Sequence, residues 1–277
     1  MKSPTSHASG SRGDARRDTN LQPGDFTRLA SDYAKYRPDY SSTVLEALLA
    51  IVGKPREAID AVDVGAGTGI WTRMLASSGL RSVTGIEPND QMRQQAIDSD
   101  RQEQIRWLTG SAEATGLDAH SADILTMASS FHWAHFESAM EEFKRVLRPG
   151  GRFVAVWNPR RVDHDPLFVA VEQALAELGP EIRRVSSGRS GITETLTNRL
   201  SALRDFEDVC YFEGRHTVVM TRERYLGAWR SVNDIRVQLG EARFEEFLRR
   251  VEELLGQREE VEASYITRAW TAKSRPN

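Results

Sequence analysis

The sequence predicts an α/β fold built on a doubly wound, mostly parallel sheet. Between residues 61 and 157, short apolar stretches of strand length alternate with helical patterns, and short loops separate them. A glycine-rich turn, Asp63 to Gly69, follows the first apolar stretch directly. Glycine lacks a side chain and accepts unusual dihedral angles, so such a turn brings bare backbone close to a ligand. These two observations predict an open sheet with a ligand site at the end of its first strand.

The expected elements follow one another along the chain. Apolar residues at helical spacing predict a helix within residues 26–40, which Pro38 ends, and a second helix over 42–52. The expected strands of the core are 61–64, 82–86, 105–109, 122–129 and 152–157. The expected helices between them are 70–78, 89–97 and 136–146, and the motif Leu147 to Gly151 predicts a helix stop followed by a tight turn.

The last 120 or so residues break this alternation. Two strand-like stretches, 206–220 and 259–273, could pair antiparallel and complete the sheet with antiparallel C-terminal strands. Amphipathic helical patterns within 159–205 and 221–258 predict a helical substrate lid above the ligand edge of the sheet. Residues 23–158 would then form the ligand-binding α/β core with its N-terminal cap helices. Residues 1–22 contain almost no large apolar side chain, which predicts a disordered tail or arm.

Composition narrows the class of protein. The net charge is −3, with acidic and basic residues interspersed, so the sequence does not predict a nucleic-acid partner. The single cysteine, Cys210, excludes an intramolecular disulfide and a cysteine cluster for metal. No apolar run approaches the length of a membrane span, and the N-terminus has no hydrophobic signal core. We therefore expect a cytoplasmic protein without a membrane partner.

The spacing of the glycines discriminates between two ligand classes. Dinucleotide sites need Gly-x-Gly-x-x-Gly, but the pattern here is Gly-x-Gly-x-Gly, and Ile70 stands where the third dinucleotide glycine would be. Glu87 closes the second expected strand about 20 residues after the turn. A carboxylate at that place can accept hydrogen bonds from both hydroxyls of a ribose. The pair therefore favours a nucleoside ligand that is not a dinucleotide.

Four motifs in order carry a resemblance to a known family. They are Asp63 to Gly69, Glu87, Gly110-Ser111-Ala112-Glu113, and Leu147-Arg148-Pro149-Gly150-Gly151. Over about residues 26 to 157 the chain resembles the class I S-adenosylmethionine-dependent methyltransferases, which implies a Rossmann-like methyltransferase fold and S-adenosylmethionine as cofactor. Two further strings, Tyr33 to Pro38 and Ser130-Phe131-His132-Trp133, resemble small-molecule methyltransferases near trans-aconitate methyltransferase.

The resemblance also implies which residues meet the cofactor. The residues beside its methionine part are Gly65, Ala66 and Gly67. Glu87 binds the ribose, and Pro88, Met92, Ala112 and Glu113 surround the adenine. Ser129 and Ser130 lie under the sulfonium, at the end of the fourth strand. Tyr33 and Arg37 close over the cofactor from the N-terminal helix, and Arg37 could pair with its carboxylate.

His132 is the candidate catalytic residue. A neutral histidine beside the site could take a proton from a nucleophile as the methyl group is transferred. It could equally bind a backbone group or only shape the pocket, and a carboxylate nucleophile would need no base. The candidate substrate contacts are Tyr36, Trp133 and His164, although the aromatic spacing of Tyr33 and Tyr36 also suits core packing. His132, His135 and Asp123 could suggest a metal, but a clear third ligand is missing, so no metal is expected.

The predicted function is methyl transfer from S-adenosylmethionine to the oxygen, nitrogen or carbon of a small-molecule acceptor. Two alternatives stay open at this point: a protein or RNA methyltransferase, and a non-catalytic nucleoside-binding module. The arginines Arg183, Arg184 and Arg189 could recognise an anionic substrate or belong to a charged loop. A homo-oligomer formed through the N-terminal arm is also possible.

Overall fold

The fold was analysed in a computed structural model that describes residues 29–163, 165–184, 188 and 191–276. The tail expected at residues 1–22 and the candidate substrate contact His164 lie outside these residues.

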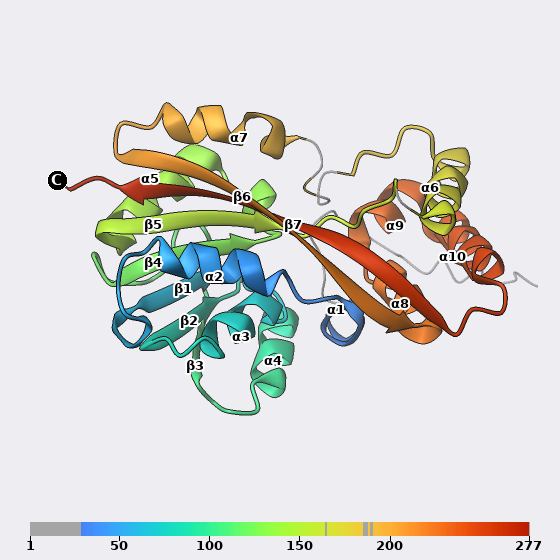
Figure 1. Ribbon diagram of the computed structural model, residues 1–277, viewed down its shortest axis with the longest axis horizontal. Coiled ribbons are helices and arrows are strands. Elements are labelled where there is room, and N and C mark those ends of the chain that lie inside the picture. Colours follow the sequence, from blue (N-terminus) through green and yellow to red (C-terminus); the bar gives the residue numbers. More distant parts are fainter. Residues whose placement is uncertain (1–28, 164, 185–187, 189–190, 277) are drawn as a thin grey trace, which may run out of the picture.

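A seven-stranded mixed sheet forms the centre of the molecule (Figure 1). Its strands lie in the order β3-β2-β1-β4-β5-β7-β6, and β1 to β5 are all parallel to one another. β7 is antiparallel to both of its neighbours, β5 and β6. The strands are β1 Asp60–Val64, β2 Ser82–Ile86, β3 Ile105–Leu108, β4 Ala122–Ala128, β5 Leu147–Trp157, β6 Phe206–Thr221 and β7 Glu260–Ser274. The predicted doubly wound sheet with antiparallel C-terminal strands is therefore confirmed.

Helices cover both faces of this sheet (Figure 1). Side chains from α2 (Ser42–Ala50) and α3 (Ile70–Ala76) form one apolar core with the strands. Side chains from α5 (Phe136–Val146) and α7 (Ile192–Ser201) form another. The central strand β4 is buried on both of its faces, from Ala122 to Met127. A continuous apolar strand of this kind is expected where helices lie on each side of a parallel sheet.

A second group of helices lies beyond the carboxyl ends of the parallel strands (Figure 1). It contains α6 Pro166–Leu178, α8 Arg222–Arg230, α9 Asn233–Leu239 and α10 Glu241–Leu255, which share one apolar cluster. β6 and β7 run from the sheet into this group, and Val261, Ala263 and Tyr265 of β7 belong to its cluster. The long pair of strands thus connects the sheet with the helical group. The first helix, α1 Ala30–Tyr36, lies against α8.

One segment of the expected lid packs elsewhere. Residues 159–205 were expected to belong to a helical lid, but only α6 joins the helical group. α7 contacts β6 and β7, because Leu196 and Leu200 are fully buried in the core of the sheet. α7 also begins at Ile192, inside a stretch whose polar, glycine-rich composition predicts a loop.

The ends of the helices follow local chemistry. Asn89 precedes α4 (Asp90–Ser99), and its side chain accepts hydrogen bonds from the backbone N–H groups of Gln91 and Met92. Thr221 caps α8 in the same manner through the N–H of Arg224, as its sequence position predicts. Two short 3₁₀ helices complete the described elements: η1 Arg56–Ala58 and η2 Phe131–Trp133.

The turn expected between α5 and β5 is absorbed into the strand. β5 already begins at Leu147, and the register with β4 shifts between the pairs Ala122–Leu147 and Ile124–Arg152. Gly150 takes a positive φ of 81° at this irregularity. The residues Leu147 to Gly151 therefore form a bulge within the strand, which accounts for the glycines.

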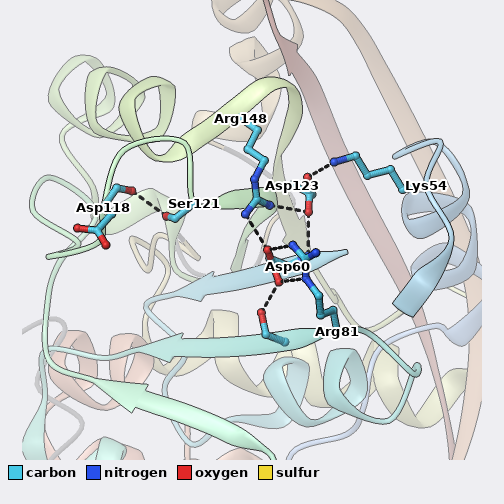
Figure 2. A network of polar contacts seen from close by, with 8 residues as sticks. Lys54, Asp60, Arg81, Asp118, Ser121, Asp123 and Arg148 are labelled. Carbon is cyan, nitrogen blue, oxygen red and sulfur yellow. Dashed lines mark hydrogen bonds and ion pairs between the residues drawn. The ribbon is translucent and has the colours of Figure 1, made fainter. Parts of the chain in front are cut away.

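A polar network joins the amino ends of β1 and β4, opposite the ligand edge (Figure 2). The guanidinium of Arg148 donates to Asp60 Oδ2 and to Asp123 Oδ2, at 2.7 Å each. Lys54 Nζ lies 2.5 Å from the other oxygen of Asp123, and Arg81 pairs with Asp60. The hydrogen bond from Arg81, with smaller contributions from Ser82 and Arg148, holds the pKa of Asp60 well below its usual range. The network fastens the first and fourth strands to each other at their starts.

Among the described residues, none of the helices is both long enough and apolar enough to cross a lipid bilayer.

Candidate active site

A cavity of about 370 Å³ lies at the carboxyl ends of the parallel strands. This volume is within the range of about 300–1,000 Å³ that is usual for small-molecule sites. One end of the cavity, which we call the turn end, is lined by Gly65, Gly67, Glu87, Met92 and Ala112. The other end, which we call the helical end, is lined by Arg160, Glu172, Trp229, Asp234 and Tyr265. His132 and Trp133 also line the cavity.

The glycine turn supplies bare backbone at the turn end. Gly65, Gly67 and Gly69 all have positive φ values, of 65°, 57° and 79°. A Cβ atom on Gly65 would lie 2.8 Å from the side chain of Ser130. A Cβ atom on Gly67 would meet nothing closer than Met92 Cε at 4.0 Å, so a larger side chain there would extend into the cavity. Gly65 and Gly67 thus present bare backbone to a ligand at this end.

Glu87 is held at the same end by backbone groups. Its Oε2 accepts from the N–H of Gly67 at 2.7 Å, and its Oε1 accepts from the N–H of Asn89 at 2.8 Å. The residue is only 7% exposed, and this burial raises the pKa of its carboxyl while the two N–H donors lower it. Each carboxylate oxygen has a second lone pair, so the side chain can still accept from two further hydroxyls. These remaining acceptor positions fit the hydroxyls of the ribose of the implied cofactor.

A fully buried carboxyl, Asp63, stands at the end of β1 behind the turn. It accepts hydrogen bonds from Thr72 at 2.6 Å and from Thr126 at 2.9 Å. Burial, together with the charge of Glu87, raises the pKa of Asp63 to about 7 in spite of these two donors. Asp63 thus links β1, α3 and β4 under the site.

Met92 and Ala112 are buried and line the turn end together with Pro88 and Glu113. Glu113 accepts from the backbone N–H of His135 at 2.8 Å. This contact ties the loop before β4 to the loop that follows η2. The four residues that the resemblance places around adenine are therefore neighbours in space.

α1 and the residues that follow it directly cover part of the cavity. Tyr33 and Arg37 both line it, and the guanidinium of Arg37 lies 4.8 Å from the centre of the Tyr33 ring. Arg37 also donates to the hydroxyl of Ser231, at the end of α8, at 2.8 Å. The N-terminal segment is therefore held against the helical group by a polar contact beside the cavity.

Ser129 and Ser130 lie where β4 ends. Ser129 has a positive φ of 54°, and its hydroxyl is 2.9 Å from the hydroxyl of Tyr40. The hydroxyl of Ser130 donates to the carbonyl of Val64 at the end of β1. Burial raises the pKa of Tyr40, so this phenol stays neutral and can hold Ser129 in place. Trp71, whose direction the sequence leaves open, is 2% exposed and packs edge-on against Tyr40 at 5.2 Å.

His132 lies on η2, directly after β4. The indole Nε1 of Trp157, at the end of β5, donates to His132 Nδ1 at 3.4 Å. Burial lowers the pKa of His132 to about 4, although the charge of Asp234 acts in the opposite direction. Trp133 is 43% exposed and its ring centre lies 4.7 Å from that of His132, so it borders both the cavity and the solvent.

The helical end contains charged groups that face aromatic rings. The guanidinium of Arg160 lies 4.9 Å from the ring centre of Tyr225 and 4.6 Å from that of Trp229. Its Nε also donates to the hydroxyl of Tyr265 at 3.4 Å. Arg184 pairs with Glu172 at 3.1 Å, which places one of the three expected arginines in the cavity wall. Arg183 is exposed and Arg189 lies outside the described residues.

Tyr36 is the predicted substrate contact that the structure places outside the cavity. Its ring packs on Gly227 of α8, where an added Cβ would lie 2.2 Å from the ring. Its hydroxyl donates to Glu223 at 2.8 Å. Tyr33 and Tyr36 share the spacing of one helix face, and the structure directs the first to the cavity and the second to the interface between α1 and α8. Core packing is therefore the correct interpretation for Tyr36.

Sequence reasoning missed most residues of the helical end. Apart from Tyr40, which also lines the cavity, the missed residues come from five separate elements or loops between residues 158 and 265, and no motif connects them. The missed residues are Tyr40, Asn158, Arg160, Glu172, Trp229, Asn233, Asp234 and Tyr265. Asn158, Pro159 and Arg160 follow β5 directly, and their position after a strand of the parallel set is the one signal that could have indicated them.

The three residues considered for a metal do not meet. Asp123 belongs to the network at the amino end of β4, whereas His132 and His135 follow its carboxyl end. Within the part of the chain that the structure describes, no three His, Cys, Asp or Glu side chains are grouped as a metal site requires.

Comparison with known proteins agrees with this geometry. Residues 62–155 match the family model described as "Methyltransferase domain". An uncharacterized methyltransferase of Mycobacterium tuberculosis is 36% identical over 148 residues, which are 53% of this chain and 56% of the relative. The chain thus spans about half the length of the curated relatives that it matches. These matches show that residues 62–155 are similar to known methyltransferase domains.

Solved structures extend the comparison to the remainder of the fold. A putative type II methyltransferase from Anaeromyxobacter dehalogenans has a TM-score of 0.63 and 24% identity, over 87% of this chain and all of that one. A phosphoethanolamine N-methyltransferase of Haemonchus contortus has a TM-score of 0.51 and 12% identity, over 91% of this chain and 58% of that one. That enzyme was solved with S-adenosylhomocysteine bound. The fold is therefore the Rossmann-like fold of methyltransferases.

Proposed function

We propose that this chain transfers a methyl group from S-adenosylmethionine to a small-molecule acceptor. The observation that carries the proposal is one continuous cavity. Its lining includes Glu87, the glycine turn, His132 and the residues of the helical end. A nucleoside cofactor at the turn end and an acceptor at the helical end would lie side by side in that cavity. Holding two reactants in this manner supplies much of the rate of a displacement reaction.

The turn end has the groups that the cofactor needs. Glu87 keeps free lone pairs for the ribose hydroxyls, and the backbone of Gly65 and Gly67 lets the amino-acid part approach without a clash. Buried Met92 and Ala112 offer apolar surface to the adenine. When bound, the cofactor supplies a methyl group on a positively charged sulfur. Arg37 lines the same cavity and could meet the carboxylate of the cofactor.

The residues of this chain would orient the reactants and exclude water. The contact between Arg37 and Ser231 joins the N-terminal segment to α8, so both can cover the cavity together. Ser129, fixed by Tyr40, would shape the floor where the two reactants meet. Trp133, which is partly exposed, would form the wall at the border with the solvent.

The helical end favours a small acceptor over a macromolecule. Trp229 and Tyr265 are 2% and 4% exposed, so this end is lined by interior side chains. A protein or RNA acceptor would need to insert a group among these buried side chains to reach this end. The net charge of −3 also offers no attraction to nucleic acid. The non-catalytic nucleoside-binding module is separated from both enzymes by the measurements below.

Isothermal titration calorimetry with S-adenosylhomocysteine tests the cofactor site. We expect binding, and we expect Glu87→Ala to weaken it by roughly tenfold or more, because it removes a charge-assisted hydrogen-bond acceptor. Asp90→Ala, three residues further on α4 and with an exposed side chain, is the matched control and should change the affinity less than twofold. Absence of binding by the unaltered protein would refute both hypotheses of an enzyme, the small-molecule methyltransferase and the protein or RNA methyltransferase.

A screen of small-molecule acceptors with methyl-labelled S-adenosylmethionine tests turnover. Transfer of label to a small molecule supports the proposal, whereas transfer only to protein or RNA would replace it with the second candidate. Binding of the cofactor without any transfer, in a broad screen of all three classes, would favour the nucleoside-binding module.

A further inference from the structure

The hydrogen bond between Trp157 and His132 fixes which ring nitrogen of His132 carries a proton. Trp157 is 1% exposed, and its indole N–H points to His132 Nδ1 at 3.4 Å. An indole nitrogen is a donor only, so Nδ1 must offer its lone pair. A neutral imidazole has one hydrogen, and it therefore resides on Nε2.

The second nitrogen is a donor in need of an acceptor. His132 Nε2 is buried and has no hydrogen-bond partner among the described residues. A buried N–H without a partner is costly, which makes a ligand acceptor atom a favourable partner. The ring lines the cavity between the turn end and the helical end, where the proposed acceptor would lie.

We propose that His132 binds the acceptor molecule as a hydrogen-bond donor through Nε2–H, and that it does not act as the general base. This inference rests on the proposed function, since it assigns a partner in the acceptor part of the same cavity. A proton taken up by His132 would have to enter at Nδ1, where it would face the N–H of Trp157. Two donors directed at each other oppose that protonation, and burial without an acidic hydrogen-bond partner opposes it further.

The charged groups around the ring do not reverse this conclusion. Asp234 of α9 favours the charged imidazolium, but its effect is smaller than that of burial. Arg160, on the loop after β5, lines the same cavity, and a positive charge gives no support to a charged imidazolium. Arg184 is paired with Glu172, so this pair contributes little net charge at the helical end.

The assignment restricts the class of acceptor. The contacting group has a lone pair that can accept a hydrogen bond, as a carbonyl or carboxylate oxygen does. The nucleophilic atom arrives with its lone pair available and gives no proton to His132. Its lone pair forms the bond to the methyl carbon, the bond from that carbon to sulfur breaks, and the electron pair of the broken bond stays on sulfur.

Nitrogen NMR of the histidine side chains tests the proton position without any acceptor. The protein is prepared with ¹⁵N-labelled histidine, and the His132 signals are identified as those missing from the His132→Gln spectrum. We expect a neutral ring with the proton on Nε2 throughout pH 5 to 8. A proton on Nδ1, or titration near the ordinary histidine pKa of about 6.5, would overturn the proposal.

Trp157→Phe provides the matched variant, because it keeps an aromatic ring and removes the N–H donor, although it also removes part of the buried indole. We expect a mixture of the two neutral forms of His132 in that variant and a higher pKa. Thermal unfolding of the variant shows whether the core is intact. If His132 still holds its proton only on Nε2 in a folded Trp157→Phe protein, Trp157 does not determine which ring nitrogen carries the proton.

Kinetics with any acceptor found in the labelling screen complete the test. Glutamine retains an N–H donor but cannot act as a base at neutral pH, so His132→Gln should preserve activity about tenfold better than His132→Phe. Equal loss in both variants, together with a rate that falls below the histidine pKa, would restore the general-base role. Failure of the proposed function itself would appear separately, as absence of S-adenosylhomocysteine binding.

Discussion

The two ends of the cavity are built in opposite ways. The turn end comes from residues that are close in the sequence, since Gly65, Gly67 and Glu87 belong to one strand–helix–strand unit, and Gly67 donates directly to Glu87. The helical end comes from side chains that are far apart, such as Arg160 on the loop after β5 and Trp229 on α8. A local unit can be exchanged between proteins as a whole, whereas the helical end changes with every helix that contributes to it. Proteins that share this fold are therefore expected to keep the cofactor site and to differ in the acceptors that they bind.

The largest expected effect concerns the buried carboxyl behind the turn end. The pKa of Asp63 is raised to about 7, so between about pH 4 and pH 7 the folded protein binds a proton that the unfolded chain has released. This contribution to stability is complete below pH 4 and is lost as the pH rises through 7. It amounts to as much as about 4 kcal/mol, from three pKa units at 1.36 kcal/mol each. Chemical denaturation of Asp63→Asn from pH 5 to pH 8 should show a flatter loss of stability than the unaltered protein.

Asp118→Asn, in an exposed loop, is the control for the Asp63 measurement and should leave the pH dependence unchanged. His132 acts with the opposite sign, because its lowered pKa makes stability rise between about pH 4 and pH 6.5. An identical pH dependence in Asp63→Asn and the unaltered protein would mean that the pKa of Asp63 does not differ between the folded and the unfolded state.

The next effect tests the amino end of the same strands. Arg148→Ala leaves Asp123, which is 2% exposed at its side chain, with Lys54 as its remaining charged partner. We expect a loss of about 3 kcal/mol in the free energy of unfolding, measured by urea denaturation. Arg249→Ala removes two exposed ion pairs on α10, with Glu246 and Glu253, and should cost less than about 1 kcal/mol. Equal costs would show that the network is no stronger than a surface pair.

A third prediction separates backbone strain from ligand access at the turn end. Gly65→Ala introduces a Cβ 2.8 Å from Ser130 at a positive φ of 65°, and we expect S-adenosylhomocysteine to bind at least about tenfold more weakly. Gly53→Ala is an unusually close control, since its φ is 72° but its Cβ would meet nothing within 4 Å. It should lower stability through the same backbone strain, without the contact to Ser130, and leave the affinity intact. Calorimetry with S-adenosylhomocysteine distinguishes the two variants. Similar affinities would contradict the role of Gly65 in admitting the ligand.

The smallest expected effect concerns the helical end. Arg160→Met removes the cationic contacts to Tyr225 and Trp229, which predicts a loss of about 1–2 kcal/mol in stability. The affinity for S-adenosylhomocysteine should change less than about twofold, because Arg160 lies at the opposite end from Glu87. Arg161→Met, the adjacent substitution, should cost less stability. A large loss of cofactor affinity in Arg160→Met would show that the two ends are not independent.

The same difference between the ends explains what the sequence could predict. Strand and helix periods, the glycine pattern and the distance to Glu87 are local signals, and they predicted the sheet and the turn end. Tyr36 was misplaced because helical spacing identifies a face but not the neighbour that the face meets, which here is Gly227. The position of Arg160 after β5 was a weak signal and Trp229 gave none, since their proximity depends on how α8 packs against β6 and β7. The role of His132 depended on Trp157, a residue 25 positions away.

The position of β7 has a consequence for how the chain reaches this fold. The last strand lies between β5 and β6, so it inserts into the sheet after both neighbours have been synthesised. Arg152 pairs with Lys273 across more than a hundred intervening residues, and such distant pairing slows folding because a long loop must close first. Tyr265 of the cavity wall is carried by this strand. Ligand binding should therefore appear only in the slowest phase of refolding, together with the final closure of the sheet.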